Sequence, residues 1–176
     1  MTRTLTRICL LSALLCACST PNQNEPAVVS VAQVDLQRYS GTWYEIGSFP
    51  MFFQRNCIAD TQARYTIEPE GKVGVHNQCM TKDGIDKAEG IAEAVAGSNN
   101  ARLKVAFFRP FWADYWIVDL DSDYEYATVG HPSRDYLWIL SRTPTMDGAV
   151  YKGILGRLRD QGYEVERLVQ TLQPGS

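Results

Sequence analysis

The sequence predicts an all-β protein, an eight-stranded up-and-down antiparallel β-barrel with a C-terminal α-helix packed on its outside. Short runs rich in Val, Ile, Tyr, Trp and Phe recur along the chain, and turn residues such as Gly, Pro, Asn and Asp separate them. After the last of these runs the apolar residues change to helical spacing. A chain of 176 residues with one such pattern suits a single domain around one core.

The eight expected strands are connected by explicit turns, for example Glu-Pro-Glu-Gly at 68–71 and Gly-Ser-Asn-Asn at 97–100. A barrel of this size is just wide enough to hold one small ligand. The strands are predicted at 42–49, 59–67, 72–79, 87–95, 102–108, 114–119, 125–130 and 136–141.

Two helical segments flank the strands. Asp35 is expected to cap a short turn at 36–39, ahead of the first strand. The longer helix is expected to begin near Thr143-Pro144-Thr145, which offers a cap and an early proline, and to end at Gly162, before a last strand at 164–170. Its apolar stripe, expected to lie against the barrel, consists of Met146, Val150, Ile154, Leu155 and Leu158.

The first 17 residues are typical of an export signal, with Arg3 and Arg7 before an apolar run at 8–17. That run is too short for a membrane-spanning helix, which needs about 20 residues, so a transmembrane anchor is the weaker alternative. Leu-Cys-Ala-Cys at 15–18 resembles the lipobox of bacterial lipoproteins, which implies acylation of Cys18 after cleavage. Residues 18–33 are then a lipidated cysteine with a flexible tether, and residues 34–176 are the folded domain.

The lipobox resemblance also implies a location. Ser19 follows the cysteine where an aspartate favours retention in the inner membrane, so we expect a lipid anchor in the cell outer membrane, on its periplasmic side. Loss of Arg3 and Arg7 leaves 15 basic against 20 acidic residues, a net charge of −5. That charge argues against a nucleic-acid partner, which favours a basic surface.

Five cysteines occur in the chain. Cys9 and Cys16 leave with the signal and Cys18 takes the lipid, so only Cys57 and Cys79 remain. In an oxidising compartment the two are expected to form a disulfide bond, the alternative being two unpaired thiols.

Strand order also places the connecting loops. If the first strand starts at the closed end, the loops at 50–53 and 109–112 lie at the open end, and both are apolar, Pro-Met-Phe-Phe and Arg-Pro-Phe-Trp. Such residues suit a mouth that admits lipid or touches a bilayer; the alternative is ordinary capping of the barrel top. Cys57 and Cys79 are expected at the same end.

Three motifs carry a family resemblance. Gly-Thr-Trp-Tyr-Glu-Ile at 41–46 resembles the first lipocalin motif, Asp-Tyr-Trp-Ile-Val at 114–118 leading to Asp-Leu-Asp the second, and Leu-Trp-Ile-Leu-Ser-Arg-Thr-Pro at 137–144 the third. Together with the lipobox they resemble the bacterial outer-membrane lipocalins and their apolipoprotein D relatives. The resemblance makes Gly41, Trp43 and Arg142 structural: the guanidinium is expected to stack on the indole and plug the closed end.

The ligand-binding residues are expected on the inner wall. Strand alternation turns Tyr65, Asn77 and Phe107 inward, and the apolipoprotein D resemblance adds Trp116. Tyr136 completes an apolar wall with a few polar tips, as ligand cavities tend to have. The alternative is that these inward aromatic residues fill a solid core.

The sequence offers little for catalysis. No Gly-x-Ser-x-Gly, His-Glu-x-x-His or phosphate-binding glycine loop occurs, and His76 and His131 stand apart, so neither a catalytic site, a metal nor a cofactor is expected. The resemblance implies binding of a fatty acid or lysophospholipid for membrane upkeep under stress. The alternatives are a lipid-modifying enzyme that uses a cavity thiol and a structural envelope lipoprotein; both a monomer and an oligomer are compatible with the sequence.

Overall fold

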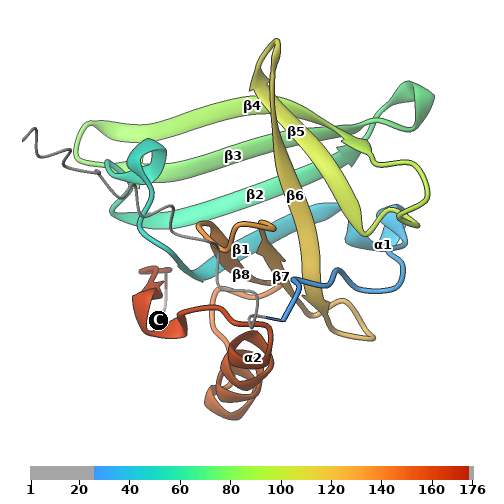
Figure 1. Ribbon diagram of the computed structural model, residues 1–176. Coiled ribbons are helices and arrows are strands. Elements are labelled where there is room, and N and C mark those ends of the chain that lie inside the picture. The colour runs from blue at the N-terminus through green and yellow to red at the C-terminus, as the bar shows by residue number, and fades with distance from the viewer. Residues whose placement is uncertain (1–25, 175–176) are drawn as a thin grey trace, which may run out of the picture.

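The computed structural model describes residues 26–174, and these form the predicted barrel (Figure 1). From β1 to β8 each strand pairs with its neighbour in the chain in antiparallel fashion, and β8 and β2 both pair with β1, which closes the sheet on itself. The strands are β1 (Gly41–Ser48), β2 (Ala59–Ile67), β3 (Val73–Thr81), β4 (Gly84–Ala94), β5 (Arg102–Phe108), β6 (Phe111–Leu120), β7 (Tyr126–Gly130), β8 (Leu137–Ser141) and the short β9 (Val169–Gln170). The predicted fold class is confirmed.

Two strands begin three residues earlier than predicted. β4 starts at Gly84 and pairs with β3 from Gly84 to Ala92, and β6 starts at Phe111. The predicted four-residue loop at 109–112 is therefore a tight turn at Arg109 and Pro110, flanked by the pair Phe108 and Phe111. Aromatic residues favour strands, and their pairing across the turn extends the hairpin.

The closed end carries the short helix α1 (Leu36–Tyr39). The Asp35 side chain accepts hydrogen bonds from the backbone amides of Gln37 and Arg38, as predicted for its cap. The helix places Tyr39 under the barrel, where this side chain is buried.

The long helix α2 (Gly148–Asp160) lies outside the barrel against β7, β8 and β1 (Figure 1). Its cap is Asp147, whose carboxylate accepts from the amides of Ala149 and Val150, and not the predicted Thr143-Pro144-Thr145 segment. Ile154 and Leu158 of the predicted stripe are fully buried, whereas Val150, in the first turn of the helix, is exposed. The first amides of a helix have no partner within the helix, and a carboxylate at this position accepts hydrogen bonds from them. The helix therefore begins after Asp147 and not at the predicted proline.

The chain after α2 departs from the predicted strand at 164–170. A short turn, η3 (Val165–Arg167), precedes β9. Of the segment 164–170, only the two residues of β9 pair with β1. Beyond β9, the Asp60 amide donates to the Leu172 carbonyl, so the C-terminal segment lies across the seam between β1 and β2. The Gln173 side chain donates to the carbonyls of Glu45 and Thr61, which bridges the seam where the β1–β2 ladder ends.

Two apolar clusters stabilise the domain. One fills the barrel around Trp43, and the other lies between the outer wall and α2, around Phe49 and Leu158. Val28 and Val31 pack on these clusters, so the described part of the predicted tether at 18–33 lies against the barrel. The signal at 1–17 and Cys18 lie outside the described residues.

Together the two clusters include residues of every strand from β1 to β8 and of α2, a core of the kind that independent folding requires. Across the described range no helix has the length and apolar character needed to cross a membrane.

Candidate functional site

The floor of the barrel is a stack of three side chains. The Arg142 guanidinium lies 3.8 Å from the centre of the Trp43 ring, and the Trp43 ring lies 5.0 Å from that of Tyr39. The Trp43 Nε1–H donates to the Tyr39 carbonyl at 2.8 Å. Gly41 has a φ of 96°, and a Cβ there would stand 3.3 Å from the Arg142 guanidinium, which explains the glycine. Trp43 and Arg142 thus stack at the closed end as expected, and the structural role of these motif residues stays a prediction.

Above the floor, three phenol groups meet inside the barrel. The Tyr115 hydroxyl is hydrogen-bonded to those of Tyr39, at 2.8 Å, and Tyr65, at 2.7 Å. Burial raises the pKa of Tyr65 to about 12 and raises the pKa values of Tyr39 and Tyr115 well above their usual range. All three groups are therefore neutral hydrogen-bonding groups at physiological pH and do not act as bases.

The middle of the inner wall is apolar with one polar atom. Phe107 packs on the interior cluster, and a Cβ at Gly90 would come within 2.9 Å of its ring. Ala88, Gly90 and Ala92 face inward from β4, because they pair with the inward residues of β3. Among the latter, Asn77 has a buried Oδ1 that accepts no hydrogen bond from any described residue. Phe107 fills the place beside Gly90, whereas the small Ala88 stays accessible and leaves space beside the unsatisfied acceptor of Asn77.

The open end is lined by stacked aromatic rings. Tyr136 lies between Phe53 of the 50–58 loop and Trp138 of β8, with ring centres 6.2 Å apart on each side. The Trp138 Nε1–H donates to Gln54 Oε1 at 3.0 Å, which holds the loop against the inner wall. Tyr65, Asn77, Phe107 and Tyr136 therefore all lie along the interior or at its mouth, as predicted; their contact with a ligand stays a prediction.

The inward orientation predicted for Trp116 is wrong. Trp116 packs with the outer cluster, as does Val118, whereas Tyr115 and Ile117 point into the barrel. Asp114 indicates the outward orientation of Trp116, because residues two apart on a strand share a face. Asp114 pairs across the sheet with the outward Lys104. Tyr115 was the interior residue that the sequence reading missed.

The apolar loops of the open end are exposed. Phe52 is 75% accessible, Phe108 81% and Phe111 78%. They stand on the connections after β1 and β5, at the end of the barrel where Cys57 and Cys79 form a disulfide bond. The predicted disulfide is confirmed, and it uses both cysteines of the described part of the chain.

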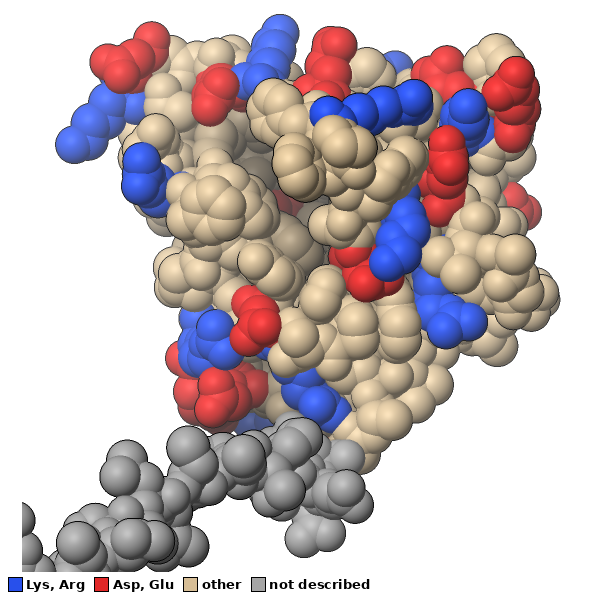
Figure 2. Space-filling model, turned by 45° about the horizontal axis from the view of Figure 1, so that its top comes forward, with Lys and Arg blue, Asp and Glu red and all other residues tan. Residues whose placement is uncertain are grey.

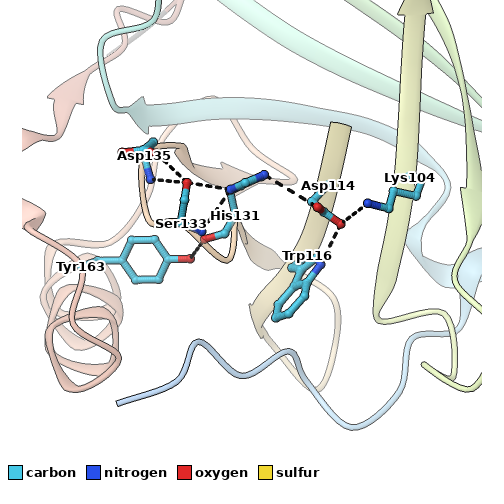
Figure 3. Close-up of polar contacts among 7 residues, drawn as sticks. All are labelled: Lys104, Asp114, Trp116, His131, Ser133, Asp135 and Tyr163. Atoms are coloured by element: carbon cyan, nitrogen blue, oxygen red, sulfur yellow. Dashed lines mark hydrogen bonds and ion pairs between the residues drawn. The ribbon is translucent and has the colours of Figure 1, made fainter. Parts of the chain in front are cut away.

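A polar chain runs along the outside of the mouth (Figure 3). Lys104 contacts Asp114 at 2.8 Å, and His131 Nε2 lies 3.8 Å from the same carboxylate. His131 Nδ1 lies 2.8 Å from the Ser133 hydroxyl, which also donates to Asp135 at 2.6 Å. The order of serine, histidine and aspartate resembles a catalytic triad, but the Ser133 hydroxyl has a competing carboxylate acceptor and lies in an exposed turn. The chain joins the β7–β8 turn to β6.

This polar chain predicts a pH effect on stability. Burial disfavours the charge on Asp114, yet the Lys104 ion pair and the Trp116 and His131 contacts outweigh it, so the pKa of Asp114 is lowered. A lowered pKa adds stability above the unfolded-state pKa, which is lost as the pH falls through the folded-state value. Asp114→Asn should lower the free energy of unfolding by about 1 kcal/mol at pH 7, and by progressively less toward pH 2.

Urea denaturation of both proteins between pH 2 and pH 7 measures this difference. Lys104→Gln is the matched variant, because it removes the main partner of Asp114 and should flatten the same pH dependence. A difference between wild type and Asp114→Asn that is constant with pH would contradict the assignment.

No described group of three or more His, Cys, Asp or Glu side chains is arranged to hold a metal ion. The fold and site thus define a class of protein: a closed antiparallel barrel with a plugged floor, an apolar interior and an aromatic mouth at the other end. Figure 2 shows the surface hollowed, with mainly uncharged side chains around the hollow.

Comparison of the chain with known proteins identifies the family to which it belongs. Residues 34–173 match the family model of the lipocalin-like domain, and the chain belongs to the lipocalin family. It is 39% identical over 165 residues to the outer membrane lipoprotein Blc of Citrobacter freundii, covering 93% of this chain and 92% of that one. Apolipoprotein D of Mus musculus is 34% identical over 151 residues, or 79% and 77% of the two chains. The fold is similar to insecticyanin of the tobacco hornworm Manduca sexta, with a TM-score of 0.68, 19% identity and coverage of 84% and 85%.

Proposed function

We propose that the protein reversibly binds a single-chain lipid, a fatty acid or a lysophospholipid, inside its barrel. The observation that carries the proposal is the interior itself, an apolar wall beside small β4 residues with one buried acceptor, Asn77 Oδ1, that no described residue satisfies. Buried polar atoms are nearly always hydrogen-bonded, so this atom suits a hydroxyl or acid group of a ligand. Family membership supports the same function, because lipocalins typically bind small hydrophobic molecules.

The driving force is burial of the acyl chain. Each buried methylene contributes about 0.8 kcal/mol, so a chain of about 16 carbons contributes up to about 13 kcal/mol before the cost of association and ordering is subtracted. Micromolar or tighter affinity is within this range. The exposed aromatic residues at the mouth, Phe52, Phe108 and Phe111, give such a chain an apolar path from a membrane.

The lipid anchor at Cys18 and the similarity to Blc support a location at the outer membrane, on its periplasmic side. Three acyl chains anchor a protein firmly, so the barrel itself is free to exchange lipid. There the protein stores or transports lipid for maintenance of the outer membrane under stress. The two cysteines of the described residues, Cys57 and Cys79, are bonded to each other, which leaves neither of them as a free thiol for the alternative of catalysis by a cavity thiol.

Native mass spectrometry with lipid extraction, on the chain from Ser19 onward, tests the proposal. We expect one fatty acid or lysophospholipid per protein. An interior Ala88→Trp variant should retain at least tenfold less lipid, because the indole occupies the space beside Asn77, with which Ala88 pairs. Lys87→Trp, at the adjacent position on the outer face of β4, is the control and should retain lipid normally. A protein that carries no lipid and refuses added palmitate would instead indicate a structural lipoprotein.

A further inference from the structure

The barrel wall is paired over only part of the length of β4 and β5. The two strands pair in their closed-end halves, from Ile91 with Ala106 to Ala94 with Leu103. The mouth half of β4, residues 84–90, pairs with β3 on one side and with no described strand on the other. In Figure 1, β5 and β6 turn away from the direction of β4 toward their hairpin tip. A lateral slit therefore runs from the mouth down to Gly90, between residues 84–90 of β4 and 107–112 of the β5–β6 hairpin.

The exposure of side chains on β4 indicates that the slit reaches the interior. Ala88 faces inward, because it pairs with the inward Asn77, yet it is exposed. Ala92 lies on the same face of β4, where β5 is paired, and it is buried. The two alanines differ in whether β5 stands beside them. Figure 2 shows a hollow on this side of the molecule.

One aromatic ring closes the inner end of the slit. A Cβ at Gly90 would stand 2.8 Å from the Ala106 carbonyl oxygen and 2.9 Å from the Phe107 ring, so the glycine lets β5 approach and lets the ring lie across β4. Phe107 also packs on the interior cluster. Its ring therefore lies at the junction between the slit and the interior, and a molecule that passes through the slit must displace it.

Both edges of the slit carry exposed apolar side chains. These residues are Ile85 on β4 and Phe108, Phe111 and Trp112 on the hairpin. An unpaired strand edge invites pairing with another chain, and charged side chains such as Lys87 and Glu89 disfavour it. The slit therefore suits an aliphatic chain, which needs no backbone partner, better than it suits an added strand.

We infer that the acyl chain of a bound lipid enters and leaves the barrel sideways through this slit, past the Phe107 ring, and not lengthwise through the mouth. The inference rests on the proposed lipid-binding function and adds its route. Methylene groups held in water are costly, and lengthwise entry exposes many of them at once. In the slit each methylene passes from an apolar edge to the apolar interior, while the polar headgroup stays in water outside.

A cross-link across the slit tests the route on the chain from Ser19 onward. If the β4–β5 ladder continued toward the mouth, Glu89 would stand opposite Phe108. The variant therefore combines Glu89→Cys with Phe108→Cys, and a short bismaleimide joins the two thiols. Because Cys57 and Cys79 are bonded to each other, only the introduced thiols react. Stopped-flow fluorescence with cis-parinaric acid, a fluorescent fatty acid, measures the rate constants of association and dissociation.

We expect the bridged protein to take up the probe about tenfold more slowly than the same variant without the bridge. Release should slow by the same factor, because a blocked path delays both directions equally, so the dissociation constant should stay within about twofold. Glu89→Cys with His76→Cys is the matched control. These two residues pair across the outer face of β3 and β4, so a bridge between them leaves the slit open and should not change the rates.

Two alanine variants compare the routes without a cross-link. Phe107→Ala removes the ring at the inner end of the slit, whereas Phe53→Ala removes a ring at the mouth, where it stacks on Tyr136. We expect Phe107→Ala to raise both rate constants about tenfold, and to raise them more than Phe53→Ala does. Thermal unfolding of each variant verifies its fold.

Failure of the route and failure of lipid binding give different results. If wild type and all variants leave the probe unbound, the proposed function itself fails. If wild type binds the probe and the bridge across the slit leaves the rate constants unchanged, the lateral route is overturned while lipid binding stands. Should the bridge not form, the alanine pair decides, because faster exchange in Phe53→Ala than in Phe107→Ala would place the route at the mouth.

Discussion

Replacing Trp43 with alanine is expected to lower the free energy of unfolding by about 3–5 kcal/mol, the usual cost of removing a large buried aromatic side chain. The Trp43 side chain is 0% exposed and is enclosed by Tyr39 on one side and the Arg142 guanidinium on the other. Its removal leaves a cavity at the floor and takes away the Nε1–H bond to the Tyr39 carbonyl. Equilibrium denaturation with urea, followed by circular dichroism, measures the change.

Trp112→Ala is the matched control for this substitution. Trp112 lies at the tip of the β5–β6 hairpin and is 39% exposed, so its loss should change the free energy of unfolding by less than about 0.5 kcal/mol. If Trp43→Ala cost no more than Trp112→Ala, the floor would not be part of the stabilising core. A large loss confined to Trp43 supports the structural role of the motif.

Reduction of the disulfide bond is expected to lower the free energy of unfolding by about 3 kcal/mol. Cys57 and Cys79 are 22 positions apart, and the bond restricts that loop in the unfolded chain. It also ties the loop that bears Phe53 and Gln54 to the end of β3, so its loss should loosen the mouth. Denaturation with and without dithiothreitol measures the effect on stability.

A variant with both Cys57 and Cys79 replaced by alanine provides the control. Its stability should match that of the reduced wild type and should not respond to dithiothreitol. A wild type equally stable under both conditions would contradict the chain-entropy account, provided that a thiol count verifies reduction.

Several features of the domain could be predicted from sequence because they depend on local pattern. Alternation of apolar and polar residues placed the strands, and the spacing of the three motifs placed Trp43 and Arg142 at the same end of the barrel. The predicted export signal left Cys57 and Cys79 as the expected disulfide pair, which the structure contains. Strand alternation also turned Asn77 and Phe107 inward, since the two-residue period of a strand determines the face of each side chain.

Other features depended on contacts between distant segments. Trp116 and Tyr115 are both apolar enough to face inward, and the pairing of Asp114 with Lys104 on the outer wall decided between them. The Asp147 carboxylate decided where α2 starts, because it accepts hydrogen bonds from the amides of Ala149 and Val150. The predicted start at 143–145 rested on a proline and its neighbours and did not account for these bonds.

By itself, then, the sequence determined the barrel, its plugged floor, its disulfide bond and the apolar character of its mouth, because local periodicity and composition encode them. Only the tertiary structure decided that the buried Glu45 and the exposed Arg55 line one cavity. That cavity forms where the C-terminal segment crosses the seam between β1 and β2, and Thr171, 126 positions from Glu45, supplies one of its hydrogen bonds. No local pattern reports such a contact, because it arises from the way the closed barrel brings the two ends of the domain together.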